Sequence, residues 1–367
     1  MIKKWSVLTV DDDPEKQEGI ERVLAARMDE NTFIFTAVNS FDEGITLIKN
    51  NRFDLVILDV HEDAGGPAPD ANTECEDQRG EKLLQIIKSE RFIPVVFYTG
   101  FPQKVVHLAS PFVKVVGKGS PLTELREAVR FILSTGLPEL LRHIEEQSRS
   151  YMWDSLNKVF EGKDISFPPA DISLLMARNL AGNLSQKIVK GIIGLDTNKI
   201  NPLEMYQYPP DFNECNPADI YKKSDNSWWM VMTTACDFEQ CKADNVLMAK
   251  ITPLKEHHLY SEWERQRGIF DNLSEEVKRE KVAKKPVNVA MDEVRRLVKG
   301  RNGERYKFLP GTFFIADCVV DFQDLIVVPI GDVEGYELIC HLDNPYREEM
   351  LFLFSKYYGR IGTPDYD

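Results

Sequence analysis

The first third of the chain alternates short apolar runs with amphipathic segments of helical length. The apolar runs are rich in β-branched residues, a pattern typical of strands buried on both faces of a parallel sheet. Strands are expected at Trp5–Val10, Thr32–Ala37, Leu55–Asp59, Pro94–Tyr98 and Phe112–Val116. Helices are expected at Glu15–Arg27, Phe41–Asn50, Glu81–Ser89, Gln103–Ala109 and Leu122–Leu133. Five such βα units predict a doubly wound, five-stranded parallel sheet over residues 1–136. Ser120 and Pro121 supply the expected cap and first turn of the last helix.

The pattern changes to a purely helical period over residues 137–200. Two amphipathic runs, one from Leu137 to Phe160 and one from Ile172 onward, are separated by Phe167-Pro168-Pro169. We expect a helical connector between domains. Its two helices either pack together as a hairpin within the chain or form the seam of a homodimer.

Residues 201–367 are rich in strand-forming segments. Four β-branched and aromatic runs are separated by turn residues, and FQD at 322–324 is expected to be a tight connection between two strands. A charged helical insertion is expected over residues 255–300, and a closing helix at Tyr346–Tyr358. These features predict a β-rich α+β domain built as a small barrel or curled sheet.

Polar residues of particular types follow four of the expected strands in the first domain. Asp11 and Asp12 follow the first strand, Asp59 ends the third, Thr99 follows the fourth and Lys118 follows the fifth. The carboxyl ends of parallel strands meet at one edge, where ligands bind in open α/β sheets. Each residue alone is typical of a turn or a helix cap, but the ordered set predicts a common site.

The chemistry of this set points to phosphoryl transfer. Asp11, Asp12 and Asp59 would repel one another unless a hard cation such as Mg²⁺ lies among them. Asp59 is the expected nucleophile, because carboxylates form aspartyl phosphates in other enzymes. Thr99 and Lys118 would complement the charge on the phosphoryl oxygens.

Residues 1–135 therefore resemble a response-regulator receiver domain of two-component signalling. The resemblance rests on VLTVDDDP with the acidic pair, VILDV with the phosphoacceptor Asp59, FYTG with Thr99, and VGKGSPLTEL with Lys118. It implies a flavodoxin-like fold, Mg²⁺ as cofactor, and a histidine kinase or phosphotransfer protein as partner. By overall architecture the chain also resembles receiver proteins of bacterial phage-defence relays, including those that act as phosphate sinks.

Three features depart from the receiver pattern. Gly119 and Ser120 follow Lys118 where the family has a proline, and Val115 stands in place of the usual switch aromatic. The connection at residues 61–79 is acidic and much longer than the usual βα loop of about 2–6 residues. It is either a solvated insertion or a lid that contacts a partner.

Composition limits the other functions. The formal net charge of −14 argues against nucleic-acid binding by either half, since affinity for the phosphate backbone depends on Lys and Arg. No run of eighteen apolar residues is present, so we expect a cytoplasmic protein without a membrane anchor. The six cysteines lack paired zinc spacing and are expected to be reduced thiols.

Two interpretations remain for the function of the C-terminal domain. In the first, the protein acts through contacts with an effector protein, as a switch or as a phosphate sink. In the second, the receiver controls a hydrolase or nuclease whose catalytic residues include Cys236 or Asp237 in the run TTACD.

Overall fold

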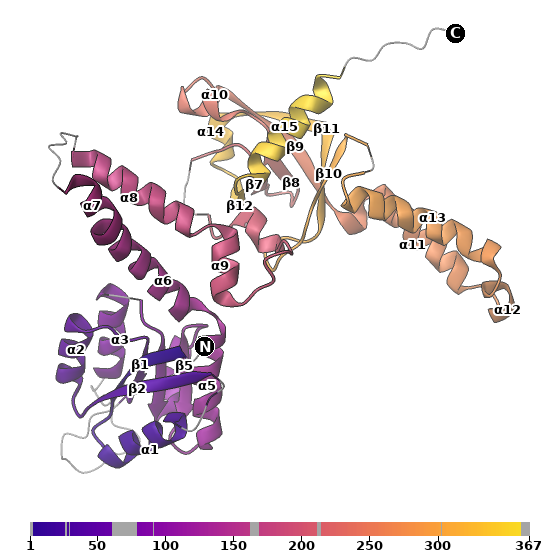
Figure 1. Ribbon diagram of the computed structural model, residues 1–367. Coiled ribbons are helices and arrows are strands. Elements are labelled where there is room, and N and C mark those ends of the chain that lie inside the picture. Colours follow the sequence, from indigo (N-terminus) through magenta and orange to yellow (C-terminus); the bar gives the residue numbers. More distant parts are fainter. Residues whose placement is uncertain are drawn as a thin grey trace, which may run out of the picture. The chain divides into compact units, whose positions relative to one another are not determined.

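The computed structural model forms two compact units, Met1–Asn198 and Lys199–Asp367 (Figure 1). It describes residues 3–25, 28, 30–60, 79–90, 92–161, 169–210, 214–301 and 303–360. The acidic connection expected at residues 61–79 therefore lies outside the described residues except for its last position, and its role stays a prediction.

The first unit contains the expected parallel sheet. Its strands are β1 (Lys3–Val10), β2 (Asn31–Val38), β3 (Leu55–Leu58), β4 (Val95–Thr99) and β5 (Val113–Gly117). They are arranged in the order β2-β1-β3-β4-β5, and every neighbouring pair is parallel. This is the flavodoxin-like order of a doubly wound sheet, so the predicted fold class is confirmed.

Helices cover both faces of this sheet. They are α1 (Pro14–Ala25), α2 (Phe41–Asn50), α3 (Arg79–Glu90), α4 (Pro102–Val105) and α5 (Leu122–Ser134). Helices α1 and α5 share one apolar core with the sheet, and α2, α3 and α4 share the other. The buried residues of α5, Leu125, Val129 and Ile132, follow the helical period that the sequence predicts. Helices therefore cover both faces of the sheet, and a ligand can approach the sheet at the ends of its strands.

Two local expectations in this unit were wrong. Helix α5 is capped by Pro121 without a side-chain hydrogen bond, whereas Ser120 belongs to the preceding turn and its N–H donates to the Gly117 carbonyl. The fourth helix is a single α turn followed by a 3₁₀ turn over Val106–Leu108, instead of one helix through Ala109. The second difference shortens the regular helix that follows β4.

The connector is helical, as expected. It contains α6 (Leu137–Ser150), a wide π-helical turn (Tyr151–Leu156), α7 (Asn157–Phe160), α8 (Pro169–Asn183) and α9 (Gln186–Ile193). Helix α6 packs against α8 and α9. The second expected helix is broken in two, because the chain turns at Leu184 and Ser185 before α9 begins.

Helix α6 is attached to the sheet at the amino ends of the strands. Arg142 forms an ion pair with the buried Asp54, at 2.7 Å, and its guanidinium lies 4.7 Å from the ring centre of Trp5. Asp54 also accepts a hydrogen bond from the Ser6 N–H at 2.8 Å. Gly136, with φ of +69°, joins α5 to α6, and a Cβ there would lie 2.6 Å from Ile193 of α9. The connector is thus packed against the edge opposite the candidate site.

The second unit is built on a seven-stranded antiparallel sheet in the order β10-β11-β9-β8-β7-β12-β6. The strands are β6 (Tyr206–Gln207), β7 (Asp219–Lys222), β8 (Trp228–Val231), β9 (Asn245–Pro253), β10 (Tyr306–Leu309), β11 (Cys318–Pro329) and β12 (Glu337–Leu342). The helices are α10 (Ala235–Glu239), α11 (His258–Asp271), α12 (Glu275–Lys278), α13 (Lys281–Val298), α14 (Ile330–Val333) and α15 (Tyr346–Tyr358). The expectation of a curled, β-rich domain is confirmed.

The expected turn at FQD was wrong. Residues on both sides of it belong to the single strand β11, which pairs with β9 before and after Phe322–Asp324. The three residues form a bulge, and the Gln323 N–H donates to Asp321 at 2.9 Å. The short strands β6, β7 and β10 were not expected either.

The charged insertion is helical, as expected, and it forms a hairpin at one end of this sheet. Helices α11 and α13 pack side by side, with the short α12 at the tip (Figure 1). No helix in the described part of the chain is long and apolar enough to cross a membrane.

Candidate functional site

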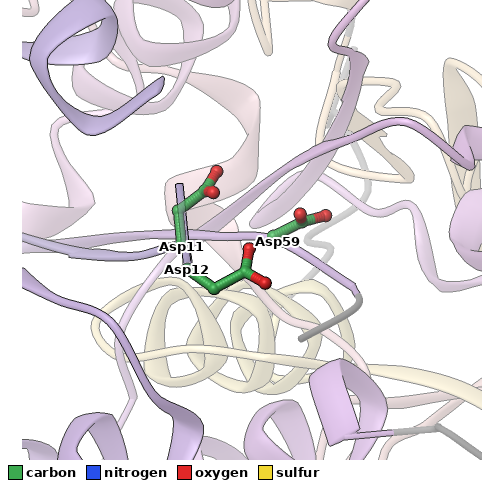
Figure 2. A group of neighbouring side chains, drawn as sticks. All are labelled: Asp11, Asp12 and Asp59. Atoms are coloured by element: carbon green, nitrogen blue, oxygen red, sulfur yellow. The ribbon is translucent and has the colours of Figure 1, made fainter. Parts of the chain in front are cut away.

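The candidate site lies where the order of the parallel sheet reverses. Strand β1 has β2 on one side and β3 on the other, so the crossovers leave β1 and β3 toward opposite faces. Asp11 and Asp12 directly follow β1, and Asp59 directly follows β3 (Figure 2). A crevice at such a reversal is the usual ligand position in doubly wound sheets.

The three carboxylates form a compact oxygen cluster. One carboxylate oxygen from each of Asp11, Asp12 and Asp59 lies within 4.8 Å of the other two. Asp11 and Asp59 are buried, and Asp12 is partly exposed. Among the described residues, this is the one group of three or more acidic, His or Cys side chains that is close enough to hold a metal ion.

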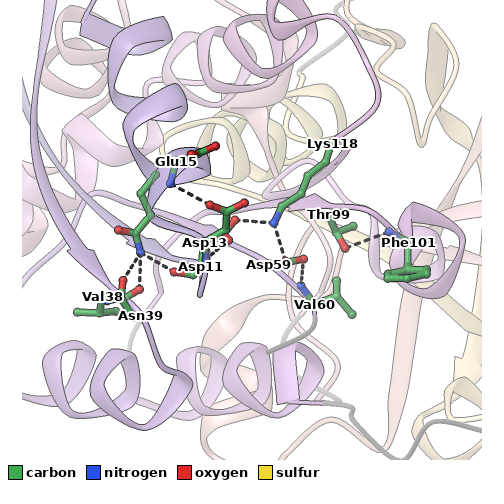
Figure 3. Close-up of polar contacts among 11 residues, drawn as sticks. Asp11, Asp13, Glu15, Val38, Asn39, Asp59, Val60, Thr99, Phe101 and Lys118 are labelled. Carbon is green, nitrogen blue, oxygen red and sulfur yellow. Dashed lines mark hydrogen bonds and ion pairs between the residues drawn. The ribbon is translucent and has the colours of Figure 1, made fainter. Parts of the chain in front are cut away.

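Lys118 joins the two buried carboxylates. Its Nζ lies 2.7 Å from Asp11 Oδ2 and 2.7 Å from Asp59 Oδ2 (Figure 3). The Lys118 backbone N–H donates to the Thr99 carbonyl at 2.7 Å, which fixes the lysine beside the end of β4. A single ammonium therefore balances part of the negative charge of the cluster.

Hydrogen bonds from backbone N–H groups and from the Gln17 side chain hold Asp11 and Asp59 in place. The Val60 N–H donates to Asp59 Oδ1 at 2.6 Å, and the Asp13 N–H donates to Asp11 Oδ1 at 3.0 Å. The buried Gln17 amide donates to the Asp11 carbonyl at 2.5 Å and to the Val38 carbonyl at 2.8 Å. These bonds hold the two carboxylates on a rigid frame.

Sequence reasoning missed the supporting roles of Asp13 and Gln17. Asp13 Oδ1 accepts the Glu15 N–H at 2.9 Å and so caps α1, and the Asp-Pro pair at positions 13 and 14 is a recognisable helix-start signal. Gln17 had no such signal, because its role depends on the return of β2 beside β1.

Thr99 is at the expected strand end but has a different immediate partner. Its side chain is fully buried, and its hydroxyl oxygen accepts the Phe101 N–H at 3.2 Å (Figure 3). Val115, one strand away in β5, is half-buried. The five expected residues thus lie at one edge, with Lys118 in direct contact with two carboxylates.

Burial and ion pairing shift the pKa values of Asp11 and Lys118 in opposite directions. Burial raises the pKa of Asp11 above its usual value, although the hydrogen bond and charge of Lys118 act to lower it. For Lys118, burial lowers the pKa, but the contacts with Asp11 and Asp59 outweigh burial and raise it. Lys118 is therefore a firmly charged ammonium, whereas Asp11 is ionised at a cost in free energy.

The donor set fits a hard divalent cation. Asp11 Oδ2 is buried, and its contact is with the Lys118 ammonium at 2.7 Å. Mg²⁺ uses one or two carboxylates together with water and substrate oxygens. The buried oxygen of Asp11 and the more exposed carboxylate of Asp12 are suited to such an ion.

The C-terminal candidates for catalysis do not form a site of this kind. Cys236 and Asp237 lie on the short helix α10, and the Thr234 hydroxyl donates to Asp237 at 2.8 Å. Cys236 is exposed. Neither residue is buried in the strand layer, and no ion pair joins either to a basic side chain among the described residues.

No protein-family model matches the chain, and no curated protein matches it. Solved structures of response-regulator receiver domains match the N-terminal part, about 35% of the chain. A Francisella receiver domain is 21% identical, with 35% of this chain and 94% of that chain covered and a TM-score of 0.26. A response regulator receiver protein from Sinorhizobium medicae is 20% identical, with 36% and 97% covered and a TM-score of 0.29. A receiver domain of an HD domain-containing protein from Pseudomonas fluorescens is 22% identical, with 36% and 95% covered and a TM-score of 0.27.

Proposed function

We propose that the first unit accepts a phosphoryl group on Asp59 in a Mg²⁺-dependent reaction, as the phosphoacceptor of a two-component-type relay. The observation that carries this proposal is the cluster of Asp11, Asp12 and Asp59 with Lys118 bridging two of its members. The supporting geometry is the reversal point of the sheet, where all these residues meet.

Each residue has a distinct role in the proposal. Asp11 and Asp12 would hold the metal together with Asp59, and Mg²⁺ there would supply positive charge to balance that of the transferred phosphoryl group. Asp59 is the acceptor because it follows the central strand β3 and one of its oxygens is already oriented by the Val60 N–H. Lys118 is positioned to contact phosphoryl oxygens, and Thr99 supplies a hydroxyl at the neighbouring strand end.

The donor is a phosphohistidine on a histidine kinase or a phosphotransfer protein. The Asp59 carboxylate attacks phosphorus, the N–P bond of the donor breaks, and an acyl phosphate forms on Asp59. The reaction requires that the donor imidazole dock at the carboxyl edge of the sheet. A protein donor places this one group there without a binding pocket for a nucleotide.

The output of the proposed relay is through protein contacts in the cytoplasm and not through DNA. Phosphorylation adds about −2 charge beside Lys118 and Thr99, and Val115 offers no aromatic ring to move with the hydroxyl. This combination favours a phosphate sink over a steep switch. A role in phage defence stays a prediction from architecture.

Phosphorylation of Asp59 can be tested directly by mass spectrometry. Incubation of the full chain with acetyl phosphate and Mg²⁺ should add one phosphoryl group, and EDTA should prevent the addition. The Asp59→Asn variant should remain unmodified, because the amide cannot act as the nucleophile. The control Glu18→Gln, at an exposed position of α1, should be modified like the wild type. An unchanged yield with Asp59→Asn would place the acceptor elsewhere.

The alternative of a C-terminal hydrolase or nuclease has no observation in its favour. Asp237 is engaged by Thr234 on a short surface helix, and Cys236 is exposed beside it. The described residues offer neither of them a basic partner, so we propose no second function.

A further inference from the structure

The second unit contains a cavity of about 950 Å³ on one face of its sheet. The floor is formed by Tyr221 of β7 and Leu338 of β12, which belong to the smaller of the two apolar layers that enclose the sheet. Phe238 of α10 and Tyr336, which precedes β12, form aromatic walls. This volume is at the upper end of the range of small-molecule sites, about 300–1,000 Å³.

Backbone hydrogen bonds hold the segments that line the cavity, one between distant segments and one within a local turn. The Ile330 N–H, at the start of α14, donates to the Asp244 carbonyl at 3.1 Å. This bond ties α14 to the segment that follows α10. The Tyr336 N–H donates to the Val333 carbonyl at 3.0 Å and fixes the wall before β12. The cavity is therefore part of the folded framework.

The charged side chains in the lining of the cavity are all acidic. Glu214, Glu239 and Glu334 line it, and no Lys, Arg or His is among the described residues of its lining. No ion pair joins any of these three carboxylates to a basic side chain in the described part of the chain. Lys223 lies outside the lining, with its Nζ 5.2 Å from the ring centre of Tyr336. One face of the Tyr336 ring is therefore already in contact with an ammonium of the chain itself.

The polar groups of the floor are neutral and unreactive. Burial raises the pKa of the Cys215 thiol to about 12, so it carries no thiolate at neutral pH. Burial also raises the pKa of Tyr221, which remains a phenol. A neutral floor near three carboxylates suits binding of a cation.

We propose that this cavity binds a small organic cation, in which an ammonium group meets Glu239 and Glu334 and an aromatic or alkyl body packs between Phe238 and Tyr336. The second unit would then be a ligand-sensing module, in addition to the phosphoacceptor site of the first unit. The aromatic walls select the hydrocarbon body, and the carboxylates select the positive charge. This assignment does not depend on phosphorylation of Asp59.

The proposal predicts a difference between two ligands with the same carbon skeleton. Titration calorimetry of the full chain with tryptamine should give saturable binding, whereas tryptophol, which has a hydroxyl in place of the ammonium, should bind at least about tenfold more weakly. Equal binding of the two probes would overturn the role of the carboxylates. Absence of saturable tryptamine binding at millimolar concentration would overturn the site itself.

Matched variants separate the cavity from general attraction to an acidic protein. The double variant Glu239→Gln, Glu334→Gln should weaken tryptamine binding about tenfold or more, and both residues are exposed, so the fold should be retained. Glu337→Gln, an exposed residue of β12 outside the lining, should leave binding unchanged. Equal weakening by the two kinds of variant would show non-specific charge attraction and would contradict the proposal.

Discussion

At the scale of single residues, the candidate site combines stabilising and destabilising contacts. Lys118 pairs with Asp11 and Asp59, but burial of Asp11 makes its ionised form costly. Functional sites are where such costs are expected, because the groups are arranged for a ligand and not for the empty fold. The site residues should therefore respond differently to substitution with and without metal.

Replacing Asp11 by Asn should stabilise the metal-free protein at neutral pH. A carboxyl with a raised pKa favours folding below its ordinary pKa of 3.8, and this contribution is lost as the pH rises through the raised value. Asp11→Asn has no carboxyl group to ionise at this position, so its stability does not fall in this way as the pH rises. Lys118 retains Asp59 as its partner. Denaturant unfolding in EDTA at pH 7 should show a higher midpoint for Asp11→Asn, and the gain should vanish near pH 3.

Magnesium should reverse this order, because the wild type gains binding free energy that the variant lacks. The control Glu18→Gln, at an exposed position of α1, should show neither effect. A lower midpoint for Asp11→Asn in EDTA would contradict the interpretation that burial of the Asp11 charge dominates.

His257 should make the second unit sensitive to mild acid. Burial lowers its pKa from 6.5 to about 4, and its Nδ1 accepts the Leu259 N–H at the start of α11. Between pH 6.5 and about 4, the His257 side chain therefore binds a proton in the unfolded state but not in the folded state. Stability from this group is present above pH 6.5 and is lost as the pH falls toward 4, by about 3 kcal/mol.

Hydrogen exchange of β10 and β11 between pH 7 and 4.5 measures this loss, after correction for the intrinsic exchange rate. The His257→Asn variant provides the control, since Asn can cap α11 but does not titrate. The wild type should lose more protection than the variant over this interval. Identical pH profiles would show that His257 does not determine the acid response.

At the scale of elements, the sequence was most informative where one physical constraint acts alone. Parallel strands buried on both faces have clear apolar runs, and because such strands share one carboxyl edge, the positions of Asp59, Thr99 and Lys118 along the chain predict that they lie together. The bulge at Phe322–Asp324 was mistaken for a turn because polar residues interrupt strands in both cases. Whether the chain reverses there depends on pairing with β9, which is distant in sequence.

The attachment of α6 to the sheet had no sequence signal either. Arg142 and Asp54 are far apart in the chain, and each alone is an ordinary charged residue. The structure pairs them at the amino edge of the strands, 2.7 Å apart, with Trp5 beneath the guanidinium. This contact makes the connector an extension of the first unit.

Removal of Arg142 should destabilise the first unit. Arg142→Ala leaves the buried Asp54 carboxylate without its cation, and because Arg142 is partly exposed we expect a loss of about 2 kcal/mol, below the usual cost at fully buried pairs. Hydrogen exchange of β1 and β3 should show the loss. Arg149→Ala, an exposed position of α6, should have little effect, and Asp54→Asn should recover part of the stability in the Arg142→Ala background.

At the scale of the whole molecule, negative charge is shared by both parts of the chain. Residues 1–137 contain 22 acidic and 16 basic residues, and residues 138–367 contain 37 and 29. Neither part has the excess of Lys and Arg from which affinity for nucleic acid arises. The shared acidity is therefore the basis for expecting that this chain does not bind DNA.

We expect no binding to DNA in either phosphorylation state. Phosphorylation of Asp59 would add negative charge to a chain whose net charge is already −14, so repulsion from the DNA backbone can only increase. Fluorescence anisotropy with random and genomic duplexes at about 150 mM salt should give no complex tighter than about 100 µM. The Asp59→Asn variant serves as the unphosphorylated control. A sequence-specific complex that weakens with salt and depends on phosphorylation would show that local basic groups outweigh the net charge, and would replace protein contacts with DNA as the output.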